Sequence, residues 1–379
     1  MSATGDGPDG ESADRDPLSF EGYERPGGSV GVRDRVLVLP SVICSHMVAD
    51  RIADRVDGAV SAPHDHGCAQ IGSDNEQTER TFLGVARNPN VAGTLVVGLG
   101  CEHVQSDAVA AQLDDLGVPV RELSIQGVGG TDPTIERGAE AARDLRETTR
   151  AGSTAADASD LTLGIVCTDL AEGTVETAAP LVGALAETVT AAGGRVVAAG
   201  IEPLLADPDA ARAAASGDAA EAVDDLLARH EGHPAKTRTV ERAARAQPFA
   251  ATTRAWGEGP IRDVLAYGEP ATHDRGLAVV DAPSQFTEAA TGLVAAGAQV
   301  VVHVTDEGVP TGHPLAPVVK VSGNEATCEA LADDIDVDAT TATAVDLRER
   351  VGDVLRGGQS RTEAHGVTDF AITRVGPSM

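Results

Sequence analysis

The sequence predicts an α/β protein of two domains, each with a mostly parallel sheet flanked by helices. Short apolar runs typical of buried strands alternate along the chain with longer amphipathic stretches typical of helices. The chain has 379 residues, which is long enough for two domains of roughly 150 residues each. Hydrophobic residues make up 42% of it, so both domains can bury a core.

The first domain is expected at residues 19–150, after a disordered acidic tail at 1–18 that lacks an apolar core. Its predicted strands lie at 35–39, 91–99 and 118–125. Its predicted helices lie at 46–56, 105–116 and 131–148, and the last of these starts with Asp132-Pro133, a capping residue followed by proline in the first turn.

Residues 151–160 are small and polar, and we interpret them as a linker to a second domain at 161–379. Strands are predicted there at 161–166, 195–199, 277–280, 299–304 and 318–321. Helices are predicted at 176–192, 206–229, 289–296 and 346–355. The same alternation of strand and helix predicts a second, mostly parallel sheet.

The formal net charge is -30, from 59 acidic and 29 basic residues, and the only lysines are Lys236 and Lys320. We interpret this excess as a surface adapted to high salt, where self-repulsion is screened over about 3 Å at 1 M. An ordinary acidic cytosolic protein is the alternative. In either case the charge argues against nucleic acid and anionic membranes as partners.

The chain is expected to be a cytoplasmic protein. No stretch reaches ~18 apolar residues, and the first residues lack the apolar segment of a signal peptide. Five cysteines at irregular spacing fit reduced thiols better than a disulfide framework. Cys44 and Cys328 lie in helical or apolar settings and are predicted to be core residues.

Polar clusters follow several predicted strands, at the edge where open parallel sheets bind ligands. They are Cys101-Glu102 and the segments 126–131, 167–169, 281–284 and 305–308. The glycine-rich loop at 127–130 either presents N–H groups to an anion at a helix N-terminus or is only a tight turn. It is no nucleotide fingerprint, because residues 98–100 lack the third glycine and no Gly-Lys-Thr motif occurs.

The richest cluster of possible metal ligands is His64, His66 and Cys68, with Cys101 and Glu102 after the next strand. Alternate residues of an extended segment point to one side, so the first three could share one ion. Other interpretations stay open: a small buried thiol at 101, a helix-capping carboxylate at 102, and surface or hydrogen-bonded histidines. A zinc finger is excluded, because no Cys-x-x-Cys pair exists.

These residues lie within a resemblance to the altronate and galactarate dehydratase family, whose relatives include the large subunit of sulfolactate sulfo-lyase. The resemblance covers residues 19–379 and is densest over 19–138. It is carried by FEGYERPGG at 20–28, VLVLP at 36–40, HDHGCAQ at 64–70, NPNVAG at 88–93, GLGCE at 98–102, residues 125–131, DAP at 281–283 and KVSGN at 320–324.

The resemblance implies a hydro-lyase that removes water from a sugar acid with a divalent metal, Fe²⁺ as the usual ion or Mn²⁺ instead. A metal on substrate oxygens would stabilise the enediolate while a base takes the proton next to the carboxylate. It implies metal-site residues His64, Cys68, Cys101 and Glu102, and catalytic residues His66 (as ligand or base), Glu102 and Asp169. It implies substrate contacts from Gln126, Gly129, Gly130, Thr131 and Arg254.

Departures from the family pattern lie in the second half. Relatives carry Cys-Gly-Gly-Ser-Asp where this chain has Cys167-Thr168-Asp169. Relatives have a glycine-rich stretch and a Glu-Lys-Ser motif where residues 249–258 read FAATTRAWGE, in which Arg254 is the candidate cation. Residues 305–308 are acidic where relatives often have arginine. We therefore expect a different substrate or reduced activity.

Enzymes of the family also use a small domain, fused or as a separate chain, and nothing before Phe20 could form it. We expect the large subunit of an oligomeric enzyme, completed by a separate small subunit and acting on a small sugar acid. A sulfolactate sulfo-lyase large subunit is the alternative enzyme. A non-catalytic paralogue with a binding role is the alternative of another class.

Overall fold

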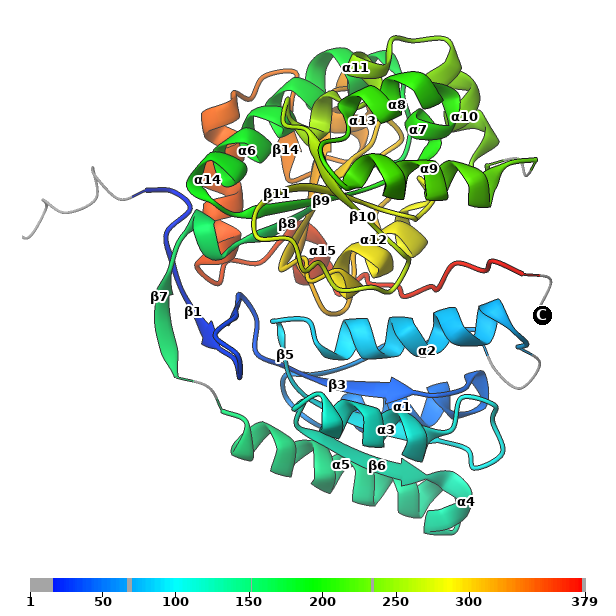
Figure 1. Cartoon of the computed structure of the whole chain (residues 1–379). Coiled ribbons are helices and arrows are strands. Elements are labelled where there is room, and N and C mark those ends of the chain that lie inside the picture. The colour runs from blue at the N-terminus through cyan, green and yellow to red at the C-terminus, as the bar shows by residue number, and fades with distance from the viewer. Residues whose placement is uncertain (1–15, 67–69, 151, 233–234, 377–379) are drawn as a thin grey trace, which may run out of the picture.

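The computed structural model describes residues 16–66, 70–150, 152–232 and 235–376, and arranges them in two α/β units (Figure 1). The first unit has a four-stranded sheet in the order β4-β3-β5-β6. The second has a seven-stranded sheet in the order β10-β11-β9-β8-β12-β13-β14. Neighbouring strands run parallel in both sheets, so the predicted fold class is confirmed.

The sheet of the first unit is covered by helices on both faces. Its strands are β3 (Arg35–Pro40), β4 (Ala59–Ser61), β5 (Val91–Gly98) and β6 (Val120–Ser124). Its helices are η1 (Ile43–Ser45), α1 (His46–Ala53), α2 (Ser73–Ala86), α3 (Ser106–Asp115), α4 (Ile125–Val128) and α5 (Thr131–Thr148). A core of Val, Leu, Ile and Ala lies between the sheet and α1 and α5, while α2 and α3 cover the other face.

The second unit has central strands that are rich in Val and Ala and buried on both faces, as expected for a parallel sheet, whereas the edge strands β10 and β14 are only partly buried. They are β8 (Thr162–Cys167), β9 (Arg195–Ala199), β10 (Ile261–Leu265), β11 (Gly276–Val280), β12 (Val300–Val304), β13 (Val318–Ser322) and β14 (Val337–Asp338). Its helices are η2 (Ala158–Asp160), η3 (Gly173–Ala178), α6 (Ala179–Ala192), α7 (Glu202–Ala206), α8 (Pro208–Ala214), α9 (Ala219–His230), α10 (Arg238–Arg245), α11 (Phe249–Thr252), η4 (Arg254–Trp256), α12 (Phe286–Ala295), α13 (Glu325–Ala330), α14 (Ala344–Leu355) and α15 (Arg361–His365).

A third, antiparallel sheet of β1 (Phe20–Glu24), β2 (Val30–Gly31) and β7 (Ser153–Ala156) lies beside the two units. The expected linker at 151–160 therefore contains a strand, which the small residues of β7 do not reveal because its partner β1 is remote in sequence. Residues 1–15 of the expected tail lie outside the described residues. Leu18, at its end, is only 1% exposed and packs in the core of the second unit.

Two local predictions are corrected by the structure. The single helix expected at 206–229 is divided into segments, because Pro208 starts α8 and Gly217, with φ 58°, separates α8 from α9. Cys44 is exposed on η1, so its assignment to the core is wrong, whereas Cys328 is buried as predicted. The described cysteines, which exclude Cys68, are free thiols.

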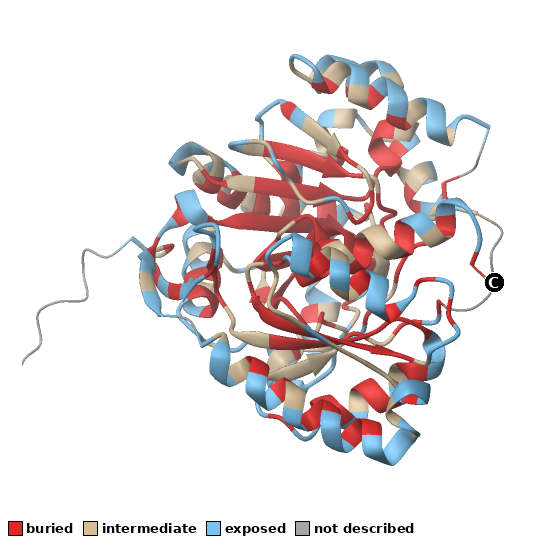
Figure 2. Cartoon of the chain, turned by 60° about the horizontal axis from the view of Figure 1, so that its bottom comes forward, coloured by how far each residue is buried: buried red, intermediate tan, exposed pale blue. Residues whose placement is uncertain are grey.

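The two units share a hydrophobic core. Phe82 and Val85 of α2 belong to the same buried cluster as Phe286 and Leu293 of α12. The segment that follows α15 runs between the units (Figure 1), and buried residues fill the central strands of both sheets and the layer between the sheets (Figure 2). In the described part of the chain, no helix combines the length and the apolar character that crossing a bilayer requires.

Candidate active site

The strand order of the first unit reverses between β3 and β5, because β4 pairs with one side of β3 and β5 with the other. Open parallel sheets bind ligands outside the carboxyl ends of their strands at such a point. Ser41 follows β3 and Glu102 follows β5, and the Ser41 hydroxyl donates a hydrogen bond of 2.9 Å to Glu102 Oε1. The predicted cluster at residues 101–102 therefore lies where this topology places a binding crevice.

Glu102 holds its own loop in place. Its Oε2 accepts hydrogen bonds from the backbone N–H groups of Gly100 at 2.7 Å and Cys101 at 2.9 Å. The residue is 2% exposed, and burial raises its pKa, but the hydrogen bonds outweigh burial and the pKa lies below its usual value. Glycine is required at 98, because a Cβ there would collide with the Glu102 carboxylate and Ser106. Glu102 is thus a charged, loop-ordering carboxylate.

His64 and His66 are buried beside this crevice, with ring centroids 5.9 Å apart. His64 Nε2 donates to the Pro40 carbonyl at 2.7 Å, and its Nδ1 accepts from the backbone N–H of His66 at 3.2 Å. Burial lowers the pKa of His64 to about 4. The bond to Pro40 places this histidine at the end of β3, next to the Ser41 that holds Glu102.

His66 connects the first unit to the C-terminal segment. Its Nε2 donates to the Ile372 carbonyl at 2.9 Å, and its Nδ1 accepts from the Gln70 side-chain amide at 2.5 Å. Burial lowers its pKa, and the nearby Arg374 lowers it further. His66 is therefore neutral at neutral pH, the protonation state of a general base.

The described residues do not fit a metal ion as they stand. Both nitrogens of each imidazole take part in hydrogen bonds, so neither ring offers a free lone pair. Among the described ranges, no three His, Cys, Asp or Glu side chains form a group that could hold a metal. Cys101 is exposed nearby, and Cys68 lies outside the described residues. The metal site remains a prediction from the resemblance.

The predicted substrate contacts after β6 lie next to the Glu102 loop. The backbone N–H of Gln126 donates to the Leu99 carbonyl at 3.1 Å, and its side-chain oxygen would lie 3.0 Å from a Cβ on Gly100. Gly129 and Gly130 have φ of 103° and 125°, which glycine adopts at least cost, and they lead into α5 at Thr131. No side chain caps this end of α5, and Pro133 lacks an N–H, so the N–H groups of Thr131 and Asp132 are the ones that could face an anion.

The predicted site residues of the second unit, Asp169 and Arg254, do not contact the Glu102 loop or the two histidines in the described structure. Asp169 accepts from Ala171 N–H, Thr174 Oγ1 and Asp306 N–H, the last at 2.7 Å, so it orders the loops after β8 and β12. Arg254 lies 3.8 Å from Glu176 on a partly exposed surface. Within the described residues, neither side chain has a hydrogen bond or ion pair to the first unit. They remain predictions as catalytic and substrate-binding residues.

A cavity of about 380 Å³ lies between the units, next to the histidine loop. Its lining includes Gln77 of α2, Glu202 and Asp281 after β9 and β11, and Arg374 of the C-terminal segment. Arg374 also lies 3.7 Å from Asp65, between the two histidines of the motif. The cavity thus joins the strand ends of the second unit to the predicted motif of the first.

Sequence reasoning missed several residues of this cavity. Lys236 donates to the Thr373 hydroxyl and lies 3.7 Å from Glu288, and burial lowers its pKa. Glu202 is fully buried, and burial raises its pKa although Ser284 donates to it. Two signals could have found them: Lys236 is one of two lysines, and Glu202 follows the correctly predicted strand at 195–199.

Comparison with known proteins identifies the family. The model "D-galactarate dehydratase/Altronate hydrolase, second domain" matches residues 22–150, and "D-galactarate/Altronate dehydratase, C-terminal" matches residues 250–378. The chain belongs to this family. The resemblance predicted from the motifs is thereby confirmed. The family's second-domain model spans His64, Glu102 and Gln126, and its C-terminal model spans Asp281 and Arg374.

Relatives within the family include two altronate dehydratases. That of Bacillus subtilis (strain 168) is 29% identical over 358 residues, which cover 87% of this chain and 71% of the relative. That of Escherichia coli (strain K12) is 29% identical over 355 residues, which cover 87% of this chain and 70% of the relative. The (2R)-sulfolactate sulfo-lyase subunit beta of Chromohalobacter salexigens is 27% identical over 390 residues, which cover 94% of this chain and 97% of the relative.

Proposed function

We propose that this chain is the large subunit of a lyase that removes water from a sugar acid. Family membership and the named relatives support a dehydratase or lyase. The observation that carries the proposal is the cavity between the units, where Lys236 and Arg374 lie near the buried Glu202 in a chain of net charge -30. A third cation of the lining, Arg229, pairs with Asp281. Three cations at a cavity of so acidic a protein suit an anionic substrate.

Glu202, which lines this cavity, and His66, which bonds to Ile372 beside the lining residue Thr373, have pKa shifts in the directions that an elimination needs. Removing water breaks the C–H bond next to the substrate carboxylate and the C–O bond of the neighbouring hydroxyl. His66 is kept neutral by burial and is our candidate to take the carbon-bound proton, once substrate displaces the Gln70 amide from Nδ1. Glu202, whose pKa is raised by burial, is our candidate to protonate the departing hydroxyl.

The substrate carboxylate is assigned to the cations of the cavity. Arg374 presents a planar guanidinium that can bind a carboxylate through two hydrogen bonds, and Lys236 adds a point charge. Gln126 and the open N-terminus of α5 remain candidates for substrate oxygens. Glu102 would act by keeping the loop at 98–102 in position.

The alternative is a sulfolactate sulfo-lyase, in which sulfite leaves instead of water. The match to the sulfo-lyase subunit beta supports it, because it covers 97% of that relative against 70–71% of the altronate dehydratases. The same comparison supports a separate small subunit, since the relative of matching length is itself named a subunit.

The decisive experiment screens substrates. The chain is purified with its small subunit and supplied with Fe²⁺ under anaerobic conditions in molar salt, with aldonates, aldarates and sulfolactate as substrates. Formation of a 2-keto acid without sulfite supports the dehydratase, and release of sulfite supports the alternative. No product from any of these substrates would overturn both and favour a non-catalytic paralogue.

Matched variants test the substrate-binding residue. We expect Arg374→Gln to raise KM tenfold or more, because a hydrogen bond to a charged group contributes about 1.5–3 kcal/mol. Arg242→Gln, an exposed arginine on α10, makes the same charge change and is expected to leave KM unchanged. Equal KM values for the two variants would contradict the assignment of Arg374.

The expectation of Fe²⁺, or of Mn²⁺ in its place, is tested by metal content. Binding at the predicted residues requires His64 or His66 to exchange a protein hydrogen bond for the ion, with Cys68, Cys101 and Glu102 as the further predicted ligands. We expect wild type prepared without oxygen to retain iron or manganese, and His64→Ala and Cys101→Ser to lose it. An active preparation that contains neither metal would contradict the prediction.

A further inference from the structure

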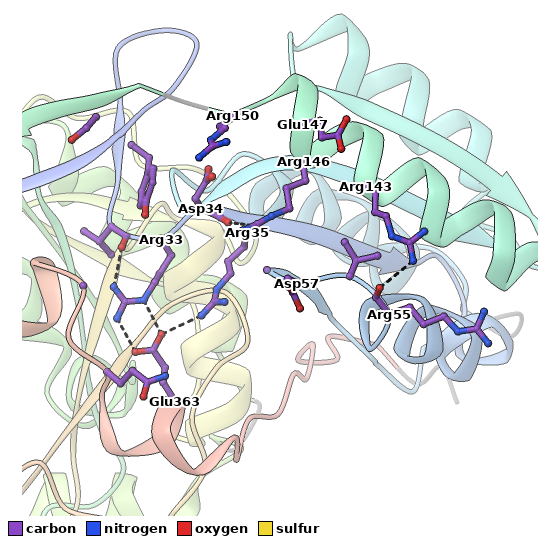
Figure 3. Close-up of a pocket in the computed structure, with 17 residues that line it drawn as sticks. Arg33, Asp34, Arg35, Arg55, Asp57, Arg143, Arg146, Glu147, Arg150 and Glu363 are labelled. Atoms are coloured by element: carbon purple, nitrogen blue, oxygen red, sulfur yellow. Dashed lines mark hydrogen bonds and ion pairs between the residues drawn. The ribbon is translucent and has the colours of Figure 1, made fainter.

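A second cavity, of about 990 Å³, lies at the other end of the first unit's sheet from the candidate site (Figure 3). Arg35 starts β3 and Gly58 immediately precedes β4, so the cavity lies at the amino ends of these strands. The last turns of α5 form one side of it. Gln359 and Glu363 of the second unit form another, so both units contribute to the lining.

The lining is rich in arginine although the chain is strongly acidic. Six of the 29 lysine and arginine residues line this cavity, namely Arg33, Arg35, Arg55, Arg143, Arg146 and Arg150. The carboxylates that line it are fewer: Asp34, Asp57, Glu147 and Glu363. The cavity thus has a positive formal charge within a protein of net charge -30.

Two of these carboxylates already have partners. Arg33 donates two hydrogen bonds of 2.8 Å, from Nε and Nη2, to the two carboxylate oxygens of Glu363. This bidentate ion pair joins the two units. Asp34 pairs with Arg25, which does not line the cavity, at 2.9 Å. Asp34 is therefore engaged outside the cavity, and Glu363 is shared between Arg33 and a longer contact to Arg35.

The remaining arginines are incompletely paired. Arg35 reaches Glu363 at 3.5 Å, on a carboxylate that Arg33 has already engaged. Arg146 contacts the Asp34 carbonyl at 3.5 Å, and Arg143 contacts the Arg55 carbonyl at 3.2 Å. In the part of the chain that the structure describes, Arg55, Arg143, Arg146 and Arg150 form no ion pair within 4.0 Å.

The arrangement concentrates positive charge at the floor of the cavity. Arg33, Arg35 and Arg146 are half-buried, whereas Arg55, Arg143 and Arg150 are exposed at the rim. Burial lowers the pKa of Arg35; Glu363 opposes this shift, while Arg33 and Arg146 add to it. Glycine at 58 makes room for the Arg146 guanidinium, which a Cβ at that position would strike.

We propose that this cavity binds a small anion with two or more carboxylate or phosphate groups, held between Arg35 and Arg146 on the floor and the arginines of the rim. Guanidinium groups match carboxylate and phosphate oxygens with paired hydrogen bonds. The volume suits a small molecule. Because both units line the cavity, the bound anion would stabilise their packing. This site is separate from the proposed active site.

The test is calorimetric titration of the full chain with pyrophosphate and with citrate in about 1 M KCl, where the Debye length is about 3 Å and diffuse attraction is screened. We expect saturable binding of one equivalent of at least one probe. Arg35→Gln and Arg146→Gln should each weaken it at least tenfold. Arg137→Gln, on an exposed face of α5 outside the cavity, makes the same charge change and should bind as wild type does.

A thermal unfolding series checks the same claim without relying on one variant. Each probe that binds should raise the unfolding midpoint of wild type and of Arg137→Gln. It should not raise that of an Arg143→Gln, Arg150→Gln double variant, whose changes lie at exposed positions of the rim. The absence of saturable binding by either probe would overturn the proposal. An equal loss of affinity in Arg137→Gln would overturn it as well.

Discussion

Buried histidines in the second unit are held neutral by their surroundings. His303 lies on β12, and its Nε2 forms a hydrogen bond of 3.0 Å with the Thr168 hydroxyl. Its ring stacks on the ring of Phe286, with the two centroids 4.3 Å apart. Its neighbour across the sheet is Lys320, whose pKa burial lowers to about 8. His313 is also fully buried, beside Phe370. These residues make the stability of the protein depend on pH.

We predict that the free energy of unfolding falls as pH drops below 6.5. Burial lowers the pKa of His303 and His313 to about 3, from 6.5 in the unfolded chain. Between these values the unfolded chain binds protons that the folded one does not, so acid favours unfolding. At about pH 5, about 1.5 units below the unfolded pKa, each histidine should lower the free energy of unfolding by about 2 kcal/mol, since one pKa unit is worth about 1.4 kcal/mol. Urea unfolding at about pH 7 and about pH 5 measures this loss.

Variants assign the loss to these two residues. His303→Gln and His313→Gln should each reduce the difference in unfolding free energy between the two pH values. His365→Gln, at an exposed position of α15, should leave the difference as in wild type. A difference that is equal in all three variants would contradict the explanation.

At the scale of elements, the contact between α2 and α12 joins the two units through a glycine. A Cβ on Gly84 would lie 2.9 Å from the Ala295 side chain and would also strike the Gly268 carbonyl. Gly84 thus permits the close approach of two helices from different units, beside the shared core that contains Phe82 and Leu293.

We predict that Gly84→Leu destabilises the protein by about 1–3 kcal/mol, because overpacking forces the helices apart. Replacing glycine by leucine in a helix also gains about 1 kcal/mol in helix propensity, which offsets part of the packing cost. The measured loss of unfolding free energy is therefore a lower limit on that packing cost. Urea unfolding of this variant is compared with Glu76→Leu, which introduces the same side chain at an exposed position of α2. Similar stabilities for the two variants would contradict the close-packing argument.

At the scale of the whole molecule, Asn90 links segments that flank strands of all three sheets. Its Oδ1 accepts from the backbone N–H groups of Val32 at 2.9 Å and Arg33 at 3.1 Å. Its Nδ2 donates to the carbonyls of Gln299 at 2.9 Å and Leu315 at 3.0 Å, in the second unit. One fully buried side chain therefore satisfies polar backbone groups from both halves of the chain.

We predict that Asn90→Ala destabilises the protein by at least about 3 kcal/mol, because each buried group left unsatisfied costs about 1–3 kcal/mol. Asn324→Ala removes a helix cap and a hydrogen bond to the partly buried Asp306 within one unit, and is expected to cost about 1–2 kcal/mol. Chemical unfolding of both variants gives the comparison. If Asn90→Ala costs no more than Asn324→Ala, the role of Asn90 as a link between the units is wrong.

Local sequence patterns predicted much of the fold but little of the candidate site. The bounds of α5 and β9 match their predictions, because helical periodicity and short apolar runs depend on near neighbours. The family could also be recognised, since its motifs are contiguous and their order along the chain is readable. The metal ligands and catalytic residues stay predictions, because motifs name residues without showing which atoms face one another.

Only the tertiary structure brings residues of the cavities together. Glu202, Lys236 and Arg374 come from three separate segments and meet at one cavity because the C-terminal segment returns between the units. The Nε2 atoms of His64 and His66 donate to the carbonyls of Pro40 and Ile372, so both histidines of the predicted metal cluster are engaged by backbone carbonyls. Backbone pairing and contacts between remote segments decide both arrangements, and neither leaves a periodic signal in the sequence.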